Sequence, residues 1–130
     1  MPELELIAKD VWGQRQELKL PGGMRLPARA TIVRLSSGGV MICSPLPIDD
    51  RVAKEIDAIG EVKLLVAPSC MHWMFVRAAL ERYPGARVLG ASGLEKKLTA
   101  AHGVAFEPLP ARGRAGALGD EILFERIEGV

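Results

Sequence analysis

The chain has 130 residues, of which 48% are hydrophobic and 25% are charged, and its formal net charge at pH 7 is +1. This length provides for one domain with one core, and the composition is too apolar for a disordered protein. The nearly balanced charge excludes the strong positive field that nucleic-acid-binding proteins need. We therefore predict a single domain over residues 1–130 that has no nucleic-acid partner.

The sequence predicts a protein without a membrane partner. No apolar run approaches the roughly 18 residues that a membrane-spanning helix needs, and Met1–Asp10 lacks the basic and then apolar order of a signal peptide. We therefore expect a cytoplasmic location. Cys43 and Cys70 are too few for a disulfide scaffold, and a reducing cytosol would keep both as thiols. The simplest interpretation is that both are small, buried apolar residues.

The first part of the chain is typical of antiparallel strands. Leu4–Ala8 and Val11–Leu20 are extended and broken by a polar dipeptide, which predicts an opening hairpin. The segment Pro21–Pro27 combines prolines and glycines, so we predict an irregular loop there that could serve as a mobile flap. Ala30–Ser36 and Val40–Ser44 flank a Ser-Gly-Gly turn, which predicts a second hairpin.

From there the pattern alternates between helices and strands. Asp49 and Asp50 open a helix with carboxylates that complement its dipole, and Gly60 ends it. The predicted order is a helix over 49–59, a strand over 64–67, a helix over 71–83, a strand over 86–90, a helix over 92–101 and a strand over 104–107. Such alternation is typical of βαβ units, so the predicted class is α/β with a mixed sheet.

The C-terminal part is interpreted as a loop followed by a strand. Ala111–Gly119 is glycine-rich and basic, but its glycines neither follow a strong strand nor open a helix, so a surface loop is favoured over a phosphate cradle. Glu121–Ile127 alternates apolar and charged residues, which predicts a last edge strand.

The candidate site is the turn that follows the strand Leu64–Ala67. Ligands are usually held at the carboxyl ends of strands in α/β sheets, and Cys70 and His72 lie at this point of the sequence. Ser69 and Trp73 are expected to line a pocket there. The simplest interpretation of His72 assigns it no metal and no catalytic role. Its imidazole would hydrogen-bond nearby backbone, and we favour this interpretation.

Two chemical interpretations of this turn stay open beside that one. Cys43 also ends a strand, and if the two strands are parallel neighbours its thiol lies at the same edge as Cys70. Zinc accepts two thiolates and one imidazole with a fourth position open, so Cys43, Cys70 and His72 are a candidate zinc site. Alternatively, a helix beginning near Met71 would favour the thiolate of Cys70 as a nucleophile, with His72 as its base.

Several short segments follow one another in a distinctive order: a Ser-Gly-Gly hairpin turn, Ser44-Pro45, Val66-Ala67-Pro68, a turn bearing His72, Tyr83-Pro84 and Ser92-Gly93-Leu94. With these segments the chain, from about Trp12 to Glu128, resembles the N-terminal half of an uncharacterised bacterial family of metallo-β-lactamase-like domains. The resemblance implies half of an αββα sandwich.

The resemblance also implies what this chain lacks. The wider superfamily hydrolyses esters, thioesters, amides or phosphodiesters with metals bound by a His-x-His-x-Asp-His motif, which would follow Pro68. This chain has Ser-Cys-Met-His-Trp there, so only Cys70 and His72 remain as ligands. The other superfamily ligands come from a C-terminal half that this sequence does not contain. A half-fold would expose an apolar sheet face, so we expect a homodimer; a fragment of a longer protein is the alternative.

Two functions follow from this comparison. The first, which we favour, is a non-catalytic domain without a cofactor that binds a small molecule or a partner protein at the strand carboxyl ends. The second is a metal-dependent hydrolase of esters, thioesters or phosphodiesters, whose site is completed by a second subunit or by a missing C-terminal half.

Overall fold

The structure is a computed structural model that describes residues 4–19, 21–68, 74–91, 93–94, 98–99, 102–108, 112–114 and 123–125, the last two segments by their backbone. Its elements are β1 (Leu4–Ala8), β2 (Val11–Lys19), η1 (Pro21–Gly23), β3 (Arg25–Arg34), β4 (Val40–Cys43), α1 (Asp50–Ile59), β5 (Val62–Ala67), α2 (Val76–Arg82), β6 (Arg87–Gly90), β7 (Glu107–Pro108), β8 (Arg112–Arg114) and β9 (Leu123–Glu125).

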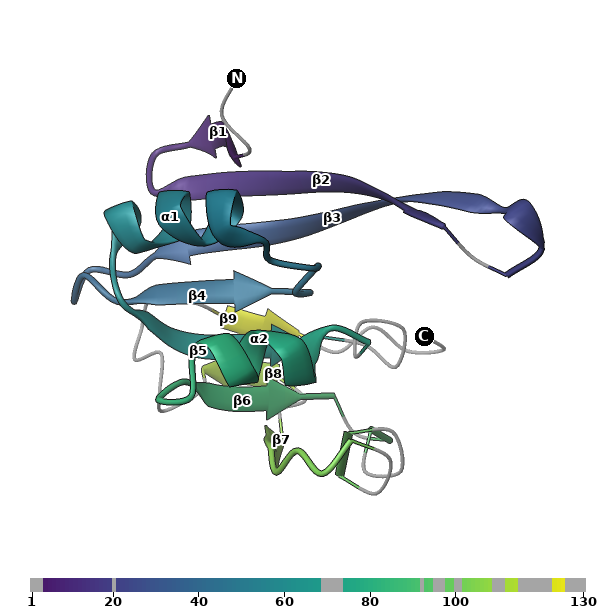
Figure 1. Ribbon diagram of the computed structural model, residues 1–130. Coiled ribbons are helices and arrows are strands. Elements are labelled where there is room, and N and C mark those ends of the chain that lie inside the picture. Colours follow the sequence, from purple (N-terminus) through teal and green to yellow (C-terminus); the bar gives the residue numbers. More distant parts are fainter. Residues whose placement is uncertain are drawn as a thin grey trace.

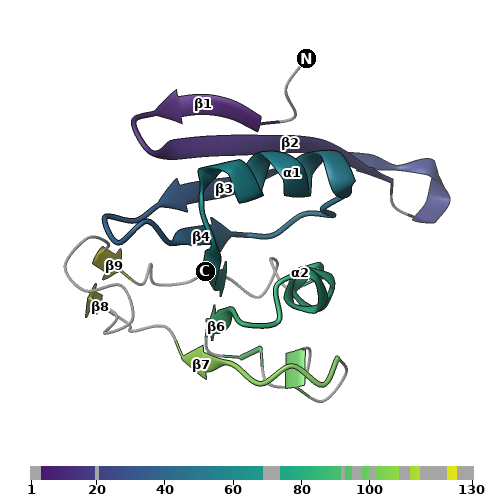
Figure 2. The same ribbon diagram turned by 60° about the vertical axis from the view of Figure 1, so that its left-hand side comes forward.

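Seven strands form one mixed sheet, in which β1 to β7 follow one another in chain order (Figure 2). Strands β1 to β4 pair antiparallel, and β4 to β7 pair parallel. Helices α1 and α2 cover one face of this sheet (Figure 1). The predicted α/β class with N-terminal hairpins and βαβ units is confirmed.

The β2–β3 hairpin is longer than the sequence predicted. Residues expected in an irregular loop pair instead, with Pro27 opposite Glu17, and only the short turn η1 connects the strands. A proline is tolerated in a strand where its missing N–H faces a side without a neighbour. Strand β4 pairs with β3 only at Thr31–Arg34, so Pro27 lies where β3 has a partner on one side. The outer hairpin, residues 15–29, projects past the sheet as an arm (Figure 1).

Helix α1 forms for the predicted reason, whereas α2 is shorter than predicted. The Asp49 carboxylate accepts a hydrogen bond of 2.9 Å from the Val52 N–H and caps α1. Helix α2 begins at Val76, and Met74 and Phe75, which were predicted to be helical, form a turn; residues 71–73 lie outside the described residues. Phe75 at the cap offers no side-chain acceptor to the first N–H groups.

The third predicted helix lies mostly outside the described residues. Leu98 donates a backbone hydrogen bond of 2.8 Å to the Leu94 carbonyl, which is a helical contact. The following strand is β7, which lies later than predicted. The basic segment expected as a loop contains β8, which pairs with β9 in a separate two-stranded sheet, so β9 is not an edge of the main sheet.

The main sheet is packed on both faces. The helix-side cluster joins strands β3 to β6 to α1 and α2, with Ile32, Ile42, Leu65, Ile56 and Val76 at most 1% exposed. A second-face cluster lies on the opposite face and consists of Leu35, Met41, Leu64, Val66 and Leu89.

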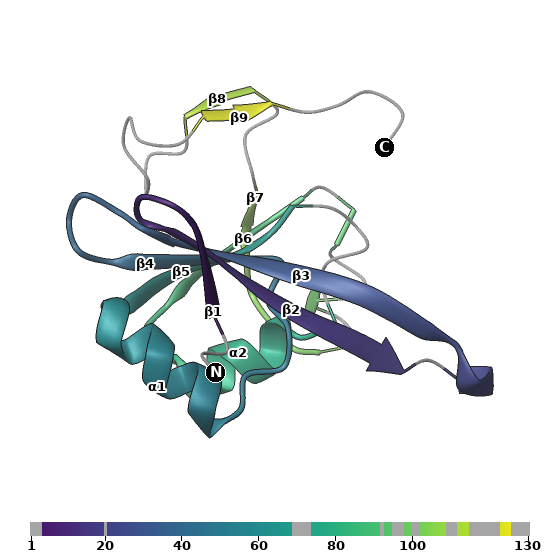
Figure 3. The same cartoon turned by 90° about the horizontal axis from the view of Figure 1, so that it is seen from above.

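The second-face cluster corrects one expectation. Its residues are only 0–7% exposed, so the apolar face that the sequence predicted is present but is not open to solvent. Strands β8 and β9 lie on this side of the sheet, away from the helices (Figure 3). Neither described helix has the length and apolar character that a membrane crossing requires.

Candidate functional site

The carboxyl ends of β4, β5 and β6 meet at one edge of the sheet because these strands are parallel neighbours. Cys43 is paired with Val66, and Ala67 with Gly90. Just past the strand ends, the Ser44 N–H donates to the Val66 carbonyl at 2.8 Å and the Ala91 N–H donates to the Ala67 carbonyl at 2.9 Å. The carboxyl edge, as we call it, is therefore a continuous row of strand ends.

Of the predicted site residues, the structure places Cys43. Ser69, Cys70, His72 and Trp73 lie outside the described residues, so their geometry stays a prediction. The condition on which the predicted thiol pair depended is met, because β4 and β5 are parallel neighbours. Cys43 thus lies at the edge where β5 ends, just before the part of the sequence that contains Cys70 and His72.

Cys43 has the environment of a protonated thiol. It is partly buried beside the second-face cluster, and this burial raises the pKa of its thiol above the ordinary value, although a hydrogen bond with the Ser44 side chain opposes the rise. The thiolate, not the thiol, attacks electrophiles and binds metals. Cys43 is therefore a poor nucleophile at neutral pH, and a metal bound here would have to displace its proton.

Ser44 is a feature of the carboxyl edge that the sequence interpretation missed. Its φ of 58° lies in the left-handed region, which a residue with a side chain rarely adopts. Such strained residues collect at functional sites, where the surrounding structure holds them in place. The Ser44-Pro45 dipeptide indicated only that a strand ends there, and nothing local distinguished a strained end from an ordinary one.

Gln14 holds the loop that leaves the carboxyl edge. Its side chain is only 4% exposed, and its Nε2 donates a hydrogen bond of 2.9 Å to the Pro47 carbonyl. This contact fixes the segment between β4 and the Asp49 cap against β2. The available signal was a polar residue at an inward-facing position of β2, two residues after Trp12.

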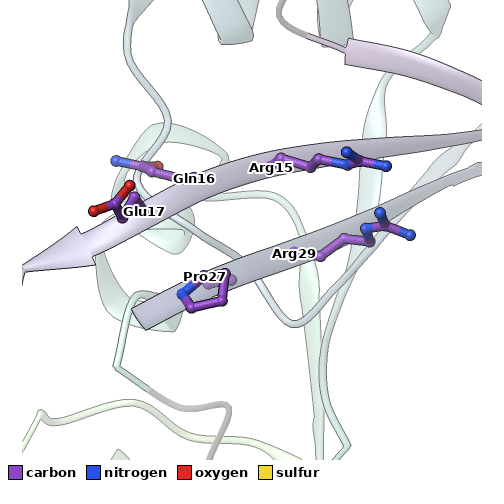
Figure 4. A pocket seen from close by; sticks show the side chains of 6 residues that line it. Arg15, Gln16, Glu17, Pro27 and Arg29 are labelled. Carbon is purple, nitrogen blue, oxygen red and sulfur yellow. The ribbon is translucent and has the colours of Figure 1, made fainter. Parts of the chain in front are cut away.

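The arm carries a second polar feature that was missed. Arg15 on β2 and Arg29 on β3 are direct cross-strand neighbours. They line an open groove of about 360 Å³ together with Gln16, Glu17, Pro27 and Ala28 (Figure 4). This juxtaposition was not predicted, because Arg15 was assigned to the strand Val11–Leu20, Arg29 to no element, and the intervening Pro21–Pro27 to an irregular loop.

The late start of α2 bears on the predicted nucleophile. A low thiolate pKa at Cys70 would need the partial positive charge of a helix N-terminus within about one turn. The described helix begins at Val76, and Met74 and Phe75 before it are a turn. Residues 69–73 lie outside the described part of the chain, so the helix support expected for the Cys70 thiolate stays a prediction.

No metal-binding group is formed within the described residues, where no three His, Cys, Asp or Glu side chains come together suitably. Cys70 and His72 are outside this part of the chain, so their proposed contribution with Cys43 is untested. Asp49 serves as the helix cap, as predicted, and Asp50 forms an exposed ion pair of 3.2 Å with Arg82.

Comparisons with known proteins identify the fold. No family model matches the chain, and no curated protein matches it. Among solved structures, the metallo-β-lactamase DIM-1 is similar to this chain with a TM-score of 0.65 at 11% sequence identity, and the match covers 90% of this chain and 57% of that one.

Two further solved structures agree with this match. A metallo-β-lactamase from Erythrobacter litoralis, with β-mercaptoethanol in its active site, has a TM-score of 0.62 at 16% identity over 88% of this chain and 54% of its own. The metallo-β-lactamase FIM-1 from Pseudomonas aeruginosa, in its mono-zinc form, has a TM-score of 0.57 at 16% identity over 83% and 50%.

These matches confirm the predicted fold. The described chain has the architecture of half of a metallo-β-lactamase-like fold and spans little more than half the length of the solved structures that it matches. At such low identity the likeness concerns the fold, and fold alone does not assign a reaction.

Proposed function

We propose that this chain is a metallo-β-lactamase-like half domain, spanning residues 1–130, that binds a small molecule or a partner protein at the carboxyl edge without hydrolysing it. One observation carries the proposal. Where the superfamily has His-x-His-x-Asp-His, the segment after Pro68 reads Ser-Cys-Met-His-Trp, and the whole chain contains only 2 histidines. A dinuclear metal site of the superfamily type lacks its imidazole ligands here.

The carboxyl edge supports a binding role. Ser44 is held in a strained conformation and Gln14 anchors the adjoining loop at Pro47, so the backbone there is preorganised. Preorganised strand ends reduce the entropy that a ligand must overcome on binding. The protonated state favoured for Cys43 suits a hydrogen-bonding or packing role better than a nucleophilic one.

A homodimer is part of the proposal. The chain spans little more than half the length of the matching structures, so a second copy would supply a body of similar size. A twofold-symmetric dimer is the commonest type of assembly. In this proposal the two copies pair through the side that bears β8 and β9. Light scattering at micromolar concentration is expected to give twice the chain mass, and a monomeric mass would contradict this part of the proposal. Two cysteines, which are too few for a disulfide scaffold, fit a cytoplasmic location.

The second candidate is a metal-dependent hydrolase of esters, thioesters or phosphodiesters, completed by a second subunit or a C-terminal half. The observation that favours it is the position of Cys43, which lies at the edge where β5 ends, just before Cys70 and His72 in the sequence. Two thiolates and an imidazole would hold a zinc ion with one open position, and such an ion supplies an activated water.

Metal content and turnover distinguish the two candidates. Protein purified without added zinc is expected to hold less than about a tenth of an equivalent, because no complete ligand set is expected. After zinc addition it is expected to leave p-nitrophenyl acetate hydrolysis at background. One equivalent of zinc that is lost in both Cys70→Ser and His72→Gln, together with turnover above background, would establish the hydrolase instead.

A further inference from the structure

Arg15 and Arg29 lie directly opposite each other on the same face of the arm. Like charges in this arrangement repel, since the Cβ atoms of such a pair are about 5 Å apart. The two guanidinium groups extend in the same direction along the hairpin, toward the body of the sheet (Figure 4). An anion that accepts hydrogen bonds from both guanidinium groups would offset this repulsion.

The nearby carboxylates neutralise the positive charge of Arg15 and Arg29 only in part. Arg15 has an exposed ion pair of 3.4 Å with Glu5, which is a weak interaction. Glu17 also lines the groove, but its carboxylate is engaged by Arg25 at 3.3 Å. Arg29 has no ion-pair or hydrogen-bond partner among the residues that the structure describes. The groove therefore contains a guanidinium group that is free to bind an anion.

Packing of the stem directs Arg29 toward the sheet. A Cβ atom placed on Gly13 would lie 3.8 Å from the Arg29 Cδ, so the aliphatic stem of Arg29 passes over this glycine. A Cβ there would also come within 2.8 Å of the Ile7 Cδ1, so a side chain at this position would crowd the surface that supports Arg29. The guanidinium group of Arg29 thus extends along the hairpin (Figure 4), on an exposed residue.

The groove adjoins the carboxyl edge. Thr31 is paired with Cys43, the last residue of β4, and Arg29 lies two residues further out on the same face of β3. Two strand residues span about 7 Å, so Arg29 lies about 7 Å beyond the end of β4, measured along β3. A small molecule at the carboxyl edge would meet these arginines on the arm side.

We infer that Arg15 and Arg29 bind an oxyanion group, a carboxylate or a phosphate, of a small molecule that occupies the carboxyl edge. The planar guanidinium fork matches both groups. The inference rests on the proposed binding function and narrows its ligands to small anions.

Amide NMR titration with inorganic phosphate, acetate and phenyl phosphate tests this. Saturable shifts are expected at Arg15 and Arg29, and the stronger of phosphate and acetate identifies the group. Arg29→Gln is expected to weaken binding about tenfold or more, as loss of a charge-assisted hydrogen bond does. Lys54→Gln on α1 removes an equal charge elsewhere and is expected to stay within about twofold of the parent, since distant exposed charges are screened.

Equal losses in the two variants, or no saturable shifts, would overturn the inference. The proposed function is tested separately in the same experiment by Ser44 and Ala67. Shifts at these two residues with neutral phenol, unchanged in Arg29→Gln, would support a site at the carboxyl edge and leave the arginines out of it. Phenyl phosphate shifts confined to the arm would support the anion groove and count against a ligand at the carboxyl edge.

Discussion

Strand β5 and the arm belong to one sheet, but β5 is buried whereas the arm is exposed to solvent. Leu65, Val66 and Ala67 on β5 are fully buried, with helices on one face and the second-face cluster on the other. On the arm, Leu26 is 49% exposed and Met24 at the tip is 65% exposed. The comparison teaches that the sheet centre provides stability and fixes the strand ends, whereas the arm presents side chains beside them.

The largest effect is expected from a cavity at the sheet centre. Leu65→Ala should lower the free energy of unfolding by about 2–5 kcal/mol, because the side chain is fully buried in the helix-side cluster. Urea denaturation monitored by circular dichroism measures this change. A loss below about 1 kcal/mol would mean that β5 does not lie in a close-packed core.

Gln14 joins the two regions, because it lies at the base of the arm and binds the loop after β4. Gln14→Leu leaves the Pro47 carbonyl without this donor, so the expected loss is about 1–3 kcal/mol. Gln16→Leu, two residues further out on the arm, is the matched control and should change stability by less than about 0.5 kcal/mol. Equal effects in the two variants would contradict the anchoring role of Gln14.

A pH effect is expected from the helix side of the body. Burial, reinforced by the Asp57 carboxylate, raises the pKa of Tyr83 to about 12. Between about pH 10, where an unfolded tyrosine ionises, and pH 12, the unfolded state loses a proton that the folded state keeps. The free energy of unfolding should therefore fall with rising pH across this range.

Tyr83→Phe isolates this contribution, because it keeps the ring and removes the ionisable hydroxyl. The unfolding free energy of the parent relative to this variant should be constant below about pH 10 and should fall above it. Urea titrations at pH 9 and pH 11 measure the difference. A pH-independent difference would show that the hydroxyl of Tyr83 titrates equally in both states.

The smallest effect is expected on the arm. Leu26→Ala should change stability by less than about 0.5 kcal/mol, because the side chain is already half exposed. Thermal unfolding of Leu26→Ala beside Leu65→Ala makes the contrast between arm and body directly visible. A loss on the arm comparable to that at Leu65 would show that the arm packs against a surface in solution, such as a second copy.

Local patterns predicted most of the fold. The apolar run at Leu64–Ala67, the Asp49 cap and the Ser-Gly-Gly turn each depend on nearby residues, and all three appear as expected. The extent of the β2–β3 hairpin was not predictable in this way. Pro27 normally breaks a strand, and its tolerance depends on β4 ending early, which is a property of the assembled sheet.

The candidate site was predictable only in outline. The carboxyl edge and the position of Cys43 on it followed from the order of strands and helices. The contacts that define its chemistry join distant segments: Gln14 reaches Pro47, and Arg15 meets Arg29 across the arm. No periodicity within either segment encodes such a meeting, because cross-strand register is set by the whole hairpin.

The central claim is that the carboxyl edge is a preorganised binding site. Screening a library of small anionic and neutral molecules by amide chemical shifts tests it most directly. The account predicts saturable shifts that cluster at Ser44, Ala67 and Ala91, with anions also shifting Arg29. Shifts that cluster elsewhere, for example on the outer face of α1, with these strand ends unchanged, would contradict it.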